Sequence, residues 1–413
     1  MKRRGLIVAL LVLAAVTVSG SRQVRTLVPL PADLQGDLNG AAYRIVVPAN
    51  WNGTLLVYAH GYGEYAVPPA LAPLAGDVTT LLDQGYALAA STFRGTGVNT
   101  KEGMEDLAAL TSFFRDAVGR PQKTIVWGKS MGGLMTLGAI EKFPGLFDGA
   151  VSLCSPAAGT PRRFDLGLDI ALAYGIVFGW HAEWGTPGDL RDDLDFAADV
   201  LPDVVANMTP AQKGRWEFIR LVTGLPVSLT VANSYYFANL RAVNMFFSTE
   251  VQAELERRAG GRIVENVGRT YALTGEEKAY LASFGLDPDA LLAQMNAQAI
   301  YVADRNARNY VEHYVDPSGD IRRPVLTMHV IDDALAVPNH AAAYRAAVEQ
   351  AGHGDLLVQA FTNGVGHCAF TSEQDVATIA AMASWLETGN RPGEAFFAAP
   401  GFNLGYVPPP WRW

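Results

Sequence analysis

The sequence predicts an α/β fold in which a mostly parallel sheet carries helices on both faces. Apolar runs of four to eight residues alternate with helical patterns, which is typical of parallel strands buried on both faces. Between about residues 155 and 323 this alternation gives way to a helical, aromatic-rich stretch, after which it resumes. A Gly-x-Ser-x-Gly pentapeptide lies between one strand and one helix. Together these observations predict one α/β domain interrupted by a helical insertion of about 160 residues.

In the first part of the chain, the elements are located by their apolar runs and the turns around them. A strand is predicted at 42–47 because the Pro- and Asn-rich turn 48–53 ends it. A second, fully apolar strand at 54–59 ends in His60-Gly61-Tyr62-Gly63. The following helix, strand, loop and helix are predicted at 68–84, 86–92, 93–97 and 102–118.

The pentapeptide Gly128-Lys129-Ser130-Met131-Gly132 has the spacing and the strand–turn–helix context of a nucleophile elbow. A serine on so sharp a turn has a strained backbone. The residues two before and two after it come close together, so only residues as small as Gly128 and Gly132 fit. The turn exposes the hydroxyl of Ser130 and places the N–H of Met131 at a helix N-terminus, where negative charge is stabilised. A serine in an ordinary glycine-rich turn is the simpler alternative.

The rest of the sheet is predicted from the remaining apolar runs. The helix that begins at Met131 extends to Phe143, and a strand at 149–154 follows it. In the aromatic-rich stretch we expect most aromatic side chains to form a helical core and the acidic cluster at 189–203 to be solvated. The last strands and helices are predicted at 325–331, 340–351, 356–361 and 372–386, and 392–413 as an irregular tail across the body.

The charge of the chain argues against two classes of partner. A formal net charge of −9 over 413 residues is unsuited to binding nucleic acid or an anionic membrane surface. The composition is that of an ordinary globular protein, without low-complexity segments or internal repeats.

The N-terminal segment 1–20 has the features of a signal peptide. The positively charged start Met1-Lys2-Arg3-Arg4 precedes an apolar run at 5–18, which is short for a membrane span. Val18 and Gly20 are small enough to precede a cleavage site. We therefore expect a secreted or periplasmic protein with no stable membrane insertion; an uncleaved anchor is the alternative.

These features resemble the α/β-hydrolase superfamily in its capped esterase or lipase form, over 42–155 and 325–386. The resemblance implies a mostly parallel sheet of about eight strands, with a helical cap inserted after the strand that follows the nucleophile helix. The insertion begins at that point here. The expected organisation is a core at 21–155 and 324–390, a cap at 156–323 and a Pro- and aromatic-rich tail at 391–413.

The catalytic histidine follows from the order Ser, Asp or Glu, His that the superfamily implies. Of seven histidines, only His340, His353 and His367 come after the strand 325–331, which should precede the acid. His340 opens a helix and is expected near the surface, and His353 precedes the last strand. His367 follows the carboxyl end of that strand, the edge where active sites of parallel sheets lie. We therefore expect His367 to be the base.

Two adjacent residues are candidates for the acid. In the superfamily a histidine is often followed four residues later by Asp and then by Val-Pro. Counting from His329 gives Asp333, but Val337-Pro338 comes one residue later than usual, which keeps Asp332 open. We favour Asp333, whose carboxylate would orient the imidazole and stabilise its protonated form.

The resemblance also indicates the groups that would hold an oxyanion. The N–H of Met131 is one donor, and the loop after 54–59 supplies the other, from Tyr62 or alternatively Gly61. His60 is expected to support this loop rather than to act as a base. The loop 93–97, which contains Arg94, is expected to be braced rather than to contact substrate.

The two cysteines are Cys154, which ends a strand, and Cys368, which adjoins His367. Feruloyl esterases and tannases are similar in pairing a cysteine beside the serine with one beside the histidine. Here Lys129 precedes Ser130, so the similarity is partial. The resemblance and an exported location favour a Cys154–Cys368 disulfide, with two buried free thiols as the alternative.

The sequence thus predicts a serine hydrolase that cleaves small-molecule or polymeric esters with an apolar or aromatic part. Ser130 would be the nucleophile, and the mechanism would need no metal or organic cofactor. An exported aminopeptidase of the same superfamily is the first alternative, and would need buried carboxylates in the cap for the substrate amine. A non-catalytic binding protein on the same fold is the second.

Overall fold

The computed structural model describes residues 26–63, 66–230 and 239–412. The expected signal peptide, 1–20, lies outside these residues. Within the described part of the chain, no helix combines the length and the apolar character that crossing a membrane would require.

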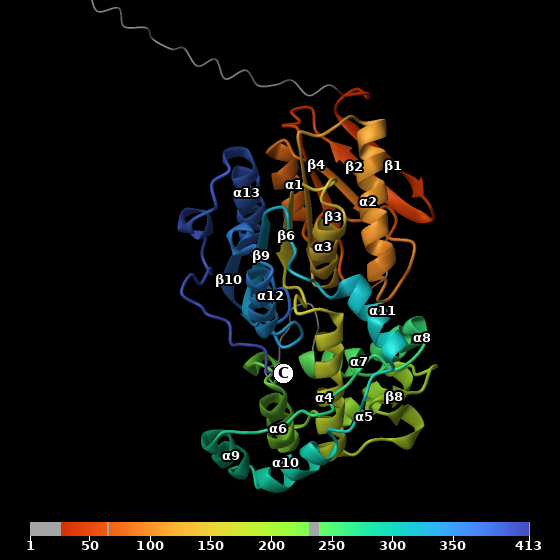
Figure 1. Cartoon of the computed structure of the whole chain (residues 1–413), viewed down its shortest axis with the longest axis vertical. Helices are drawn as coiled ribbons and strands as arrows, with labels where there is room; N and C mark the ends of the chain where they lie inside the picture. The colour runs from red at the N-terminus through yellow and green to blue at the C-terminus, as the bar shows by residue number, and fades with distance from the viewer. Residues whose placement is uncertain (1–25, 64–65, 231–238, 413) are drawn as a thin grey trace, which may run out of the picture.

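An eight-stranded sheet forms the centre of the molecule, in the order β1-β2-β4-β3-β5-β6-β9-β10 (Figure 1). The pairs β1–β2 and β2–β4 are antiparallel and all others are parallel. This confirms the predicted fold class. The strands are β1 Ala32–Leu38, β2 Ala41–Val47, β3 Thr54–Ala59, β4 Ala87–Ser91, β5 Lys123–Lys129, β6 Gly149–Leu153, β9 Val325–Asp332 and β10 Leu357–Val365.

The apolar strands separate two buried clusters, one on each face of the sheet. Along β3, Leu55 and Val57 belong to one cluster, and Leu56 and Tyr58 to the other, as the two-residue period of a strand requires. The core helices are α1 Ala75–Asp83, α2 Thr100–Ala117, α3 Met131–Lys142, α12 Asn339–Gln350 and α13 Ser372–Thr388.

Two elements differ from the sequence prediction. The helix expected at 68–84 begins only at Ala75, because Pro68, Pro69 and Pro73 cannot supply the amide hydrogens of a helix. The strand β1 was not predicted. It is a polar edge strand that pairs only with β2, so it carries no apolar run that would reveal it.

The segment between β6 and β9 is mainly helical and gathers at one end of the sheet (Figure 1). Its longest helix, α4, is buried over most of its length. Two-residue strands, β7 Gly185–Thr186 and β8 Asp189–Leu190, form a small hairpin. The insertion helices are α4 Thr160–Phe178, α5 Leu201–Ala206, α6 Lys213–Thr223, α7 Leu240–Phe247, α8 Glu250–Ala259, α9 Gly275–Ala282, α10 Pro288–Ala297 and α11 Arg305–Val315.

The C-terminal tail runs from the β10 edge of the core to the insertion (Figure 1). The N–H of Asn403 donates to the carbonyl of Phe361 in β10, and the guanidinium of Arg412 donates to the carbonyl of Leu221 in α6. Trp411 packs against His340 with 4.8 Å between the ring centroids. His340 is therefore completely buried, and the expectation that it lies near the surface was wrong because the tail covers the start of α12.

Candidate active site

Ser130 occupies a strained turn between β5 and α3. Its backbone angles, φ 57° and ψ −124°, lie in a region that a non-glycine residue rarely adopts. A Cβ atom added to Gly128 would lie 2.5 Å from the carbonyl oxygen of Ala59 and 2.7 Å from the carbonyl carbon of Gly132. The two glycines are thus required by close backbone approach, as the spacing predicts.

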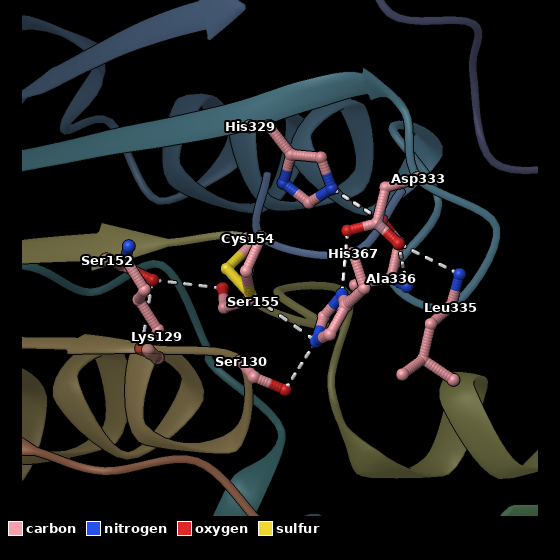
Figure 2. Close-up of a disulfide and its surroundings, with 12 residues drawn as sticks. Lys129, Ser130, Ser152, Cys154, Ser155, His329, Asp333, Leu335, Ala336 and His367 are labelled. Carbon is pink, nitrogen blue, oxygen red and sulfur yellow. Dashed lines mark hydrogen bonds and ion pairs between the residues drawn. A yellow bond between two sulfur atoms is a disulfide. The ribbon is translucent and has the colours of Figure 1, made fainter. Parts of the chain in front are cut away.

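A hydrogen-bonded chain joins Ser130 to two residues that follow parallel strands (Figure 2). The Nε2 atom of His367 lies 2.8 Å from Ser130 Oγ, and its Nδ1 atom lies 2.8 Å from Asp333 Oδ2. Asp333 directly follows β9, and His367 comes two residues after β10. All three residues therefore meet at the carboxyl edge of the sheet. There His367 could take the proton of the Ser130 hydroxyl while its oxygen attacks a substrate.

Asp333, rather than Asp332, faces the imidazole. Its Oδ1 atom accepts hydrogen bonds from the N–H groups of Leu335 (2.9 Å) and Ala336 (3.0 Å), which leaves Oδ2 for His367. Complete burial acts to raise the pKa of Asp333, but the charge of His367 and these hydrogen bonds hold that pKa below its usual value. Asp332 instead accepts the N–H of Ser228 in the insertion, at 2.9 Å.

His329 supports the loop that carries Asp333. The sequence did not predict this role, because His329 served there only to find the position of the acid. Its Nε2 atom lies 2.5 Å from the carbonyl oxygen of Ala336 (Figure 2). Burial lowers the pKa of His329, so a neutral ring that donates to this carbonyl is favoured.

The two expected oxyanion donors both border Ser130. Met131 is the first residue of α3, so helix geometry leaves its N–H without an intrahelical acceptor. Tyr62 lines the same space, and its ring packs against Phe246 and Phe247 of the insertion. Gly61, the alternative to Tyr62, lines the second cavity described below.

The neighbouring loops are braced. Nδ1 of His60 lies 2.8 Å from the carbonyl oxygen of Gly61, which holds the loop after β3. Arg94 forms ion pairs with Glu105 and, at 3.0 Å, with Asp106. Arg94 belongs to the lining of neither cavity beside Ser130.

Cys154 and Cys368 form a disulfide across the carboxyl edge of the sheet (Figure 2). The alternative of two free thiols is therefore excluded. Among the described residues, these two cysteines and His367 are the one cluster with metal-ligand spacing, but the bond between the sulfurs occupies both thiols. Lys129, which fills the position before Ser130, makes a buried ion pair of 2.6 Å with Asp375 of α13. Burial raises the pKa of Asp375 to about 7, against the lowering effect of Lys129.

The hydroxyl of Ser130 opens into two cavities between the core and the insertion. Both contain Ser130, His367, Tyr62, Phe247 and Leu335. The first is walled mainly by apolar residues, among them Val98, Leu134 and Phe164. The second extends over Tyr58, Leu74 and Phe370. One cavity is available for each side of a scissile bond. Most aromatic residues of the insertion were expected to form core; Phe247 instead lines both cavities.

One charged residue of the first cavity was not predicted. Arg163 of α4 is 5% exposed, and its side chain is part of the cavity wall. Its guanidinium carbon lies 5.4 Å from the ring centroid of Phe247. Burial lowers the pKa of Arg163 to about 10, although the charge of Asp333 opposes the shift. Nothing in the local sequence Thr160-Pro161-Arg162-Arg163 distinguishes this arginine from its neighbour.

Comparisons with known proteins relate the chain to hydrolases. Residues 76–195 match the model of the prolyl oligopeptidase family. An o-phthalyl amidase from Xanthobacter agilis is 24% identical over 423 aligned residues, which cover 86% of this chain and 88% of the amidase.

Solved structures of similar arrangement include two from Aspergillus oryzae. An esterase is 16% identical with a TM-score of 0.45, and the match covers 87% of this chain and 80% of the esterase. Feruloyl esterase B is 15% identical with a TM-score of 0.41, and the match covers 87% of this chain and 81% of that enzyme. With the sheet topology, the elbow at Ser130 and the family match, the chain belongs to the α/β-hydrolase superfamily and is a serine hydrolase.

Proposed function

We propose that the protein is an exported hydrolase that cleaves carboxylic esters with an apolar or aromatic part. The observation that carries the proposal is the hydrogen-bonded chain Ser130–His367–Asp333, which opens into two largely apolar cavities. Export is supported by the disulfide and by the signal-like sequence at 1–20.

In the proposed mechanism, Ser130 Oγ attacks the substrate carbonyl while His367 Nε2 takes its proton. Asp333 accepts a hydrogen bond from Nδ1–H, which fixes the tautomer and stabilises the imidazolium. The N–H groups of Met131 and Tyr62 bind the oxyanion. His367 then donates its proton to the leaving group, and water, deprotonated by the same imidazole, hydrolyses the acyl-enzyme.

Amide hydrolysis is a second candidate activity, because the relative from Xanthobacter agilis is an amidase. Aminopeptidase activity has less support. Such an activity would need buried carboxylates to bind the substrate amine, but in the acidic cluster of the insertion Asp189, Asp192, Asp193 and Asp195 are exposed. Among the described residues that line the two cavities there is no Asp or Glu.

A fluorophosphonate probe tests the nucleophile directly. We expect covalent labelling of wild type and none of Ser130→Ala, with loss of ester turnover by several powers of ten, because the variant has no nucleophile. Ser112→Ala, which changes an exposed serine on α2, is the matched control and should behave as wild type. Retention of a tenth of wild-type turnover in Ser130→Ala would remove Ser130 from the mechanism. An unlabelled wild-type protein would instead favour a binding protein.

The substrate class is tested by comparing p-nitrophenyl esters, N-acyl anilides and aminoacyl-p-nitroanilides. We expect turnover of the esters to exceed that of the other two. Preference for the anilides would make amide hydrolysis the principal activity, and preference for the aminoacyl substrates would establish a peptidase.

A further inference from the structure

The wall of the first cavity contains a buried cation whose terminal nitrogens have no partner. Within the described residues, Nη1 and Nη2 of Arg163 are both inaccessible to solvent and make no hydrogen bond. The residue is only 5% exposed, and it lies in the same cavity as Ser130 Oγ. A guanidinium in this state has lost its hydration without gaining the hydrogen bonds that normally compensate for it.

The catalytic carboxylate, Asp333, does not supply hydrogen-bond acceptors for the terminal nitrogens of Arg163. Its two oxygens are occupied by the N–H groups of Leu335 and Ala336 and by His367. The charge of Asp333 acts on Arg163 at a distance, but no ion pair joins the two side chains among the described residues. Phe247 offers the face of its ring, which holds the guanidinium without satisfying its N–H groups.

A planar guanidinium whose terminal nitrogens are both unpaired is suited to bidentate binding of a carboxylate. We propose that Arg163 binds a carboxylate of the substrate, so that the preferred substrates are anionic esters or amides. This inference rests on the proposed hydrolase function and specifies its substrate class.

The lining of the cavity further defines the substrate. Ser130 and Arg163 line the same cavity, so the carboxylate and the scissile carbonyl belong to one compact group. Phe164, Phe247 and Val98 provide apolar surface around it. A short apolar or aromatic group that bears the carboxylate, such as one half of an aromatic dicarboxylic acid, fits these walls.

The test compares anionic substrates with neutral analogues. Monoethyl phthalate and monoethyl terephthalate place a carboxylate on the acyl side of the ester, and ethyl benzoate is their neutral counterpart. The pair 4-acetoxybenzoate and phenyl acetate places the charge on the alcohol side. For wild type we expect at least one anionic ester to exceed its neutral counterpart about 10- to 100-fold in kcat/KM, the range expected of a charged hydrogen-bonded pair.

Arg163→Met should abolish this preference chiefly by raising KM for the anionic ester, so that the ratio of kcat/KM between the anionic ester and its neutral counterpart falls to about one. Arg163→Lys should retain part of the preference, because it keeps the charge but not the planar pair of donors. Arg162→Met is the matched control. That neighbour donates to the carbonyl of Ala158 and lies outside both cavities beside Ser130, so its kinetics should match wild type.

A second measurement does not depend on turnover. In the Ser130→Ala background, calorimetry should show that phthalate or terephthalate binds and that adding Arg163→Met weakens binding at least tenfold. Circular dichroism establishes that each variant is folded.

The inference is overturned if Arg163→Met lowers kcat equally for anionic and neutral esters, because the arginine would then act on Asp333 rather than on substrate. It is also overturned if wild type shows no preference for any anionic ester. Failure of the proposed function has a different signature, since wild type would then resist the fluorophosphonate probe whatever residue stands at 163.

Discussion

At the scale of single residues, two neighbouring carboxylates have separate tasks. Asp333 is completely buried and joined to His367, whereas Asp332 accepts the N–H of Ser228 and so ties the end of β9 to the insertion. The two carboxylates differ because their side chains point to different partners, Asp333 to the imidazole and Asp332 to the insertion. Only Asp333 is placed to orient the imidazole.

We therefore expect Asp333→Asn to reduce kcat by on the order of 10³- to 10⁴-fold, because an amide no longer stabilises the required tautomer and the imidazolium. Asp332→Asn should cost less than about tenfold, since it weakens only a contact with the insertion. Steady-state kinetics of the two purified variants on one ester provides the measurement. The opposite ranking would transfer the role of the acid to Asp332.

At the scale of elements, the disulfide connects the end of β6 with the loop between β10 and α13. Cys368 is the residue after His367, so the bridge restrains the backbone that carries the imidazole. It also closes a loop of 214 residues that includes the whole insertion. The chain-entropy model assigns such a loop on the order of 5 kcal/mol, a figure that residual structure in the unfolded chain reduces.

Removing the bridge should lower the rate more sharply than it lowers the melting temperature. A displacement of His367 by about 1 Å is enough for a loss of about 100-fold in kcat. Cys368→Ser and Cys154→Ser remove the same bond from opposite ends, and kinetics with thermal melting should give similar results for both. Intact-mass analysis after denaturation and alkylation tests the premise: two alkylated thiols in protein from an oxidising compartment would contradict it.

At the scale of the whole molecule, the stability of the protein depends on ionisable groups that the helices of the insertion bury. Glu256 of α8 accepts from the amide of Gln252 (3.3 Å) and from the N–H of Ile263 (3.4 Å). Burial raises its pKa to about 8, from 4.5 in an exposed chain. Between these pH values the folded protein keeps a proton that the unfolded chain has released. The free energy of unfolding therefore falls as pH rises from about 4.5 to about 8.

Glu256→Gln should remove this contribution, because glutamine resembles the protonated carboxyl and does not titrate. Relative to wild type, the variant should gain about 4 kcal/mol in the free energy of unfolding between pH 5 and pH 8.5, the value that a pKa of about 8 implies. Urea denaturation of both proteins at the two pH values measures the change. A constant difference between them would show that Glu256 is not protonated in the folded protein near neutral pH.

Local sequence patterns predict much of this architecture. The strands β3, β6 and β9 were located from short apolar runs, because burial on both faces leaves few polar positions. Ser130 was located because its strained turn requires small residues two positions before and two positions after it. His367 was located because it alone comes after the predicted acid in the chain and also follows the carboxyl end of a strand.

Tertiary structure decided what depends on contacts between distant segments. The choice of Asp333 over Asp332 required the position of His367, and the burial of His340 required the tail residue Trp411. Arg163 shows the limit most clearly, since its neighbour Arg162 is identical in chemistry yet lies outside the active-site cavities. Sequence determines which groups carry charge, but only packing determines which of them is buried without a partner beside Ser130.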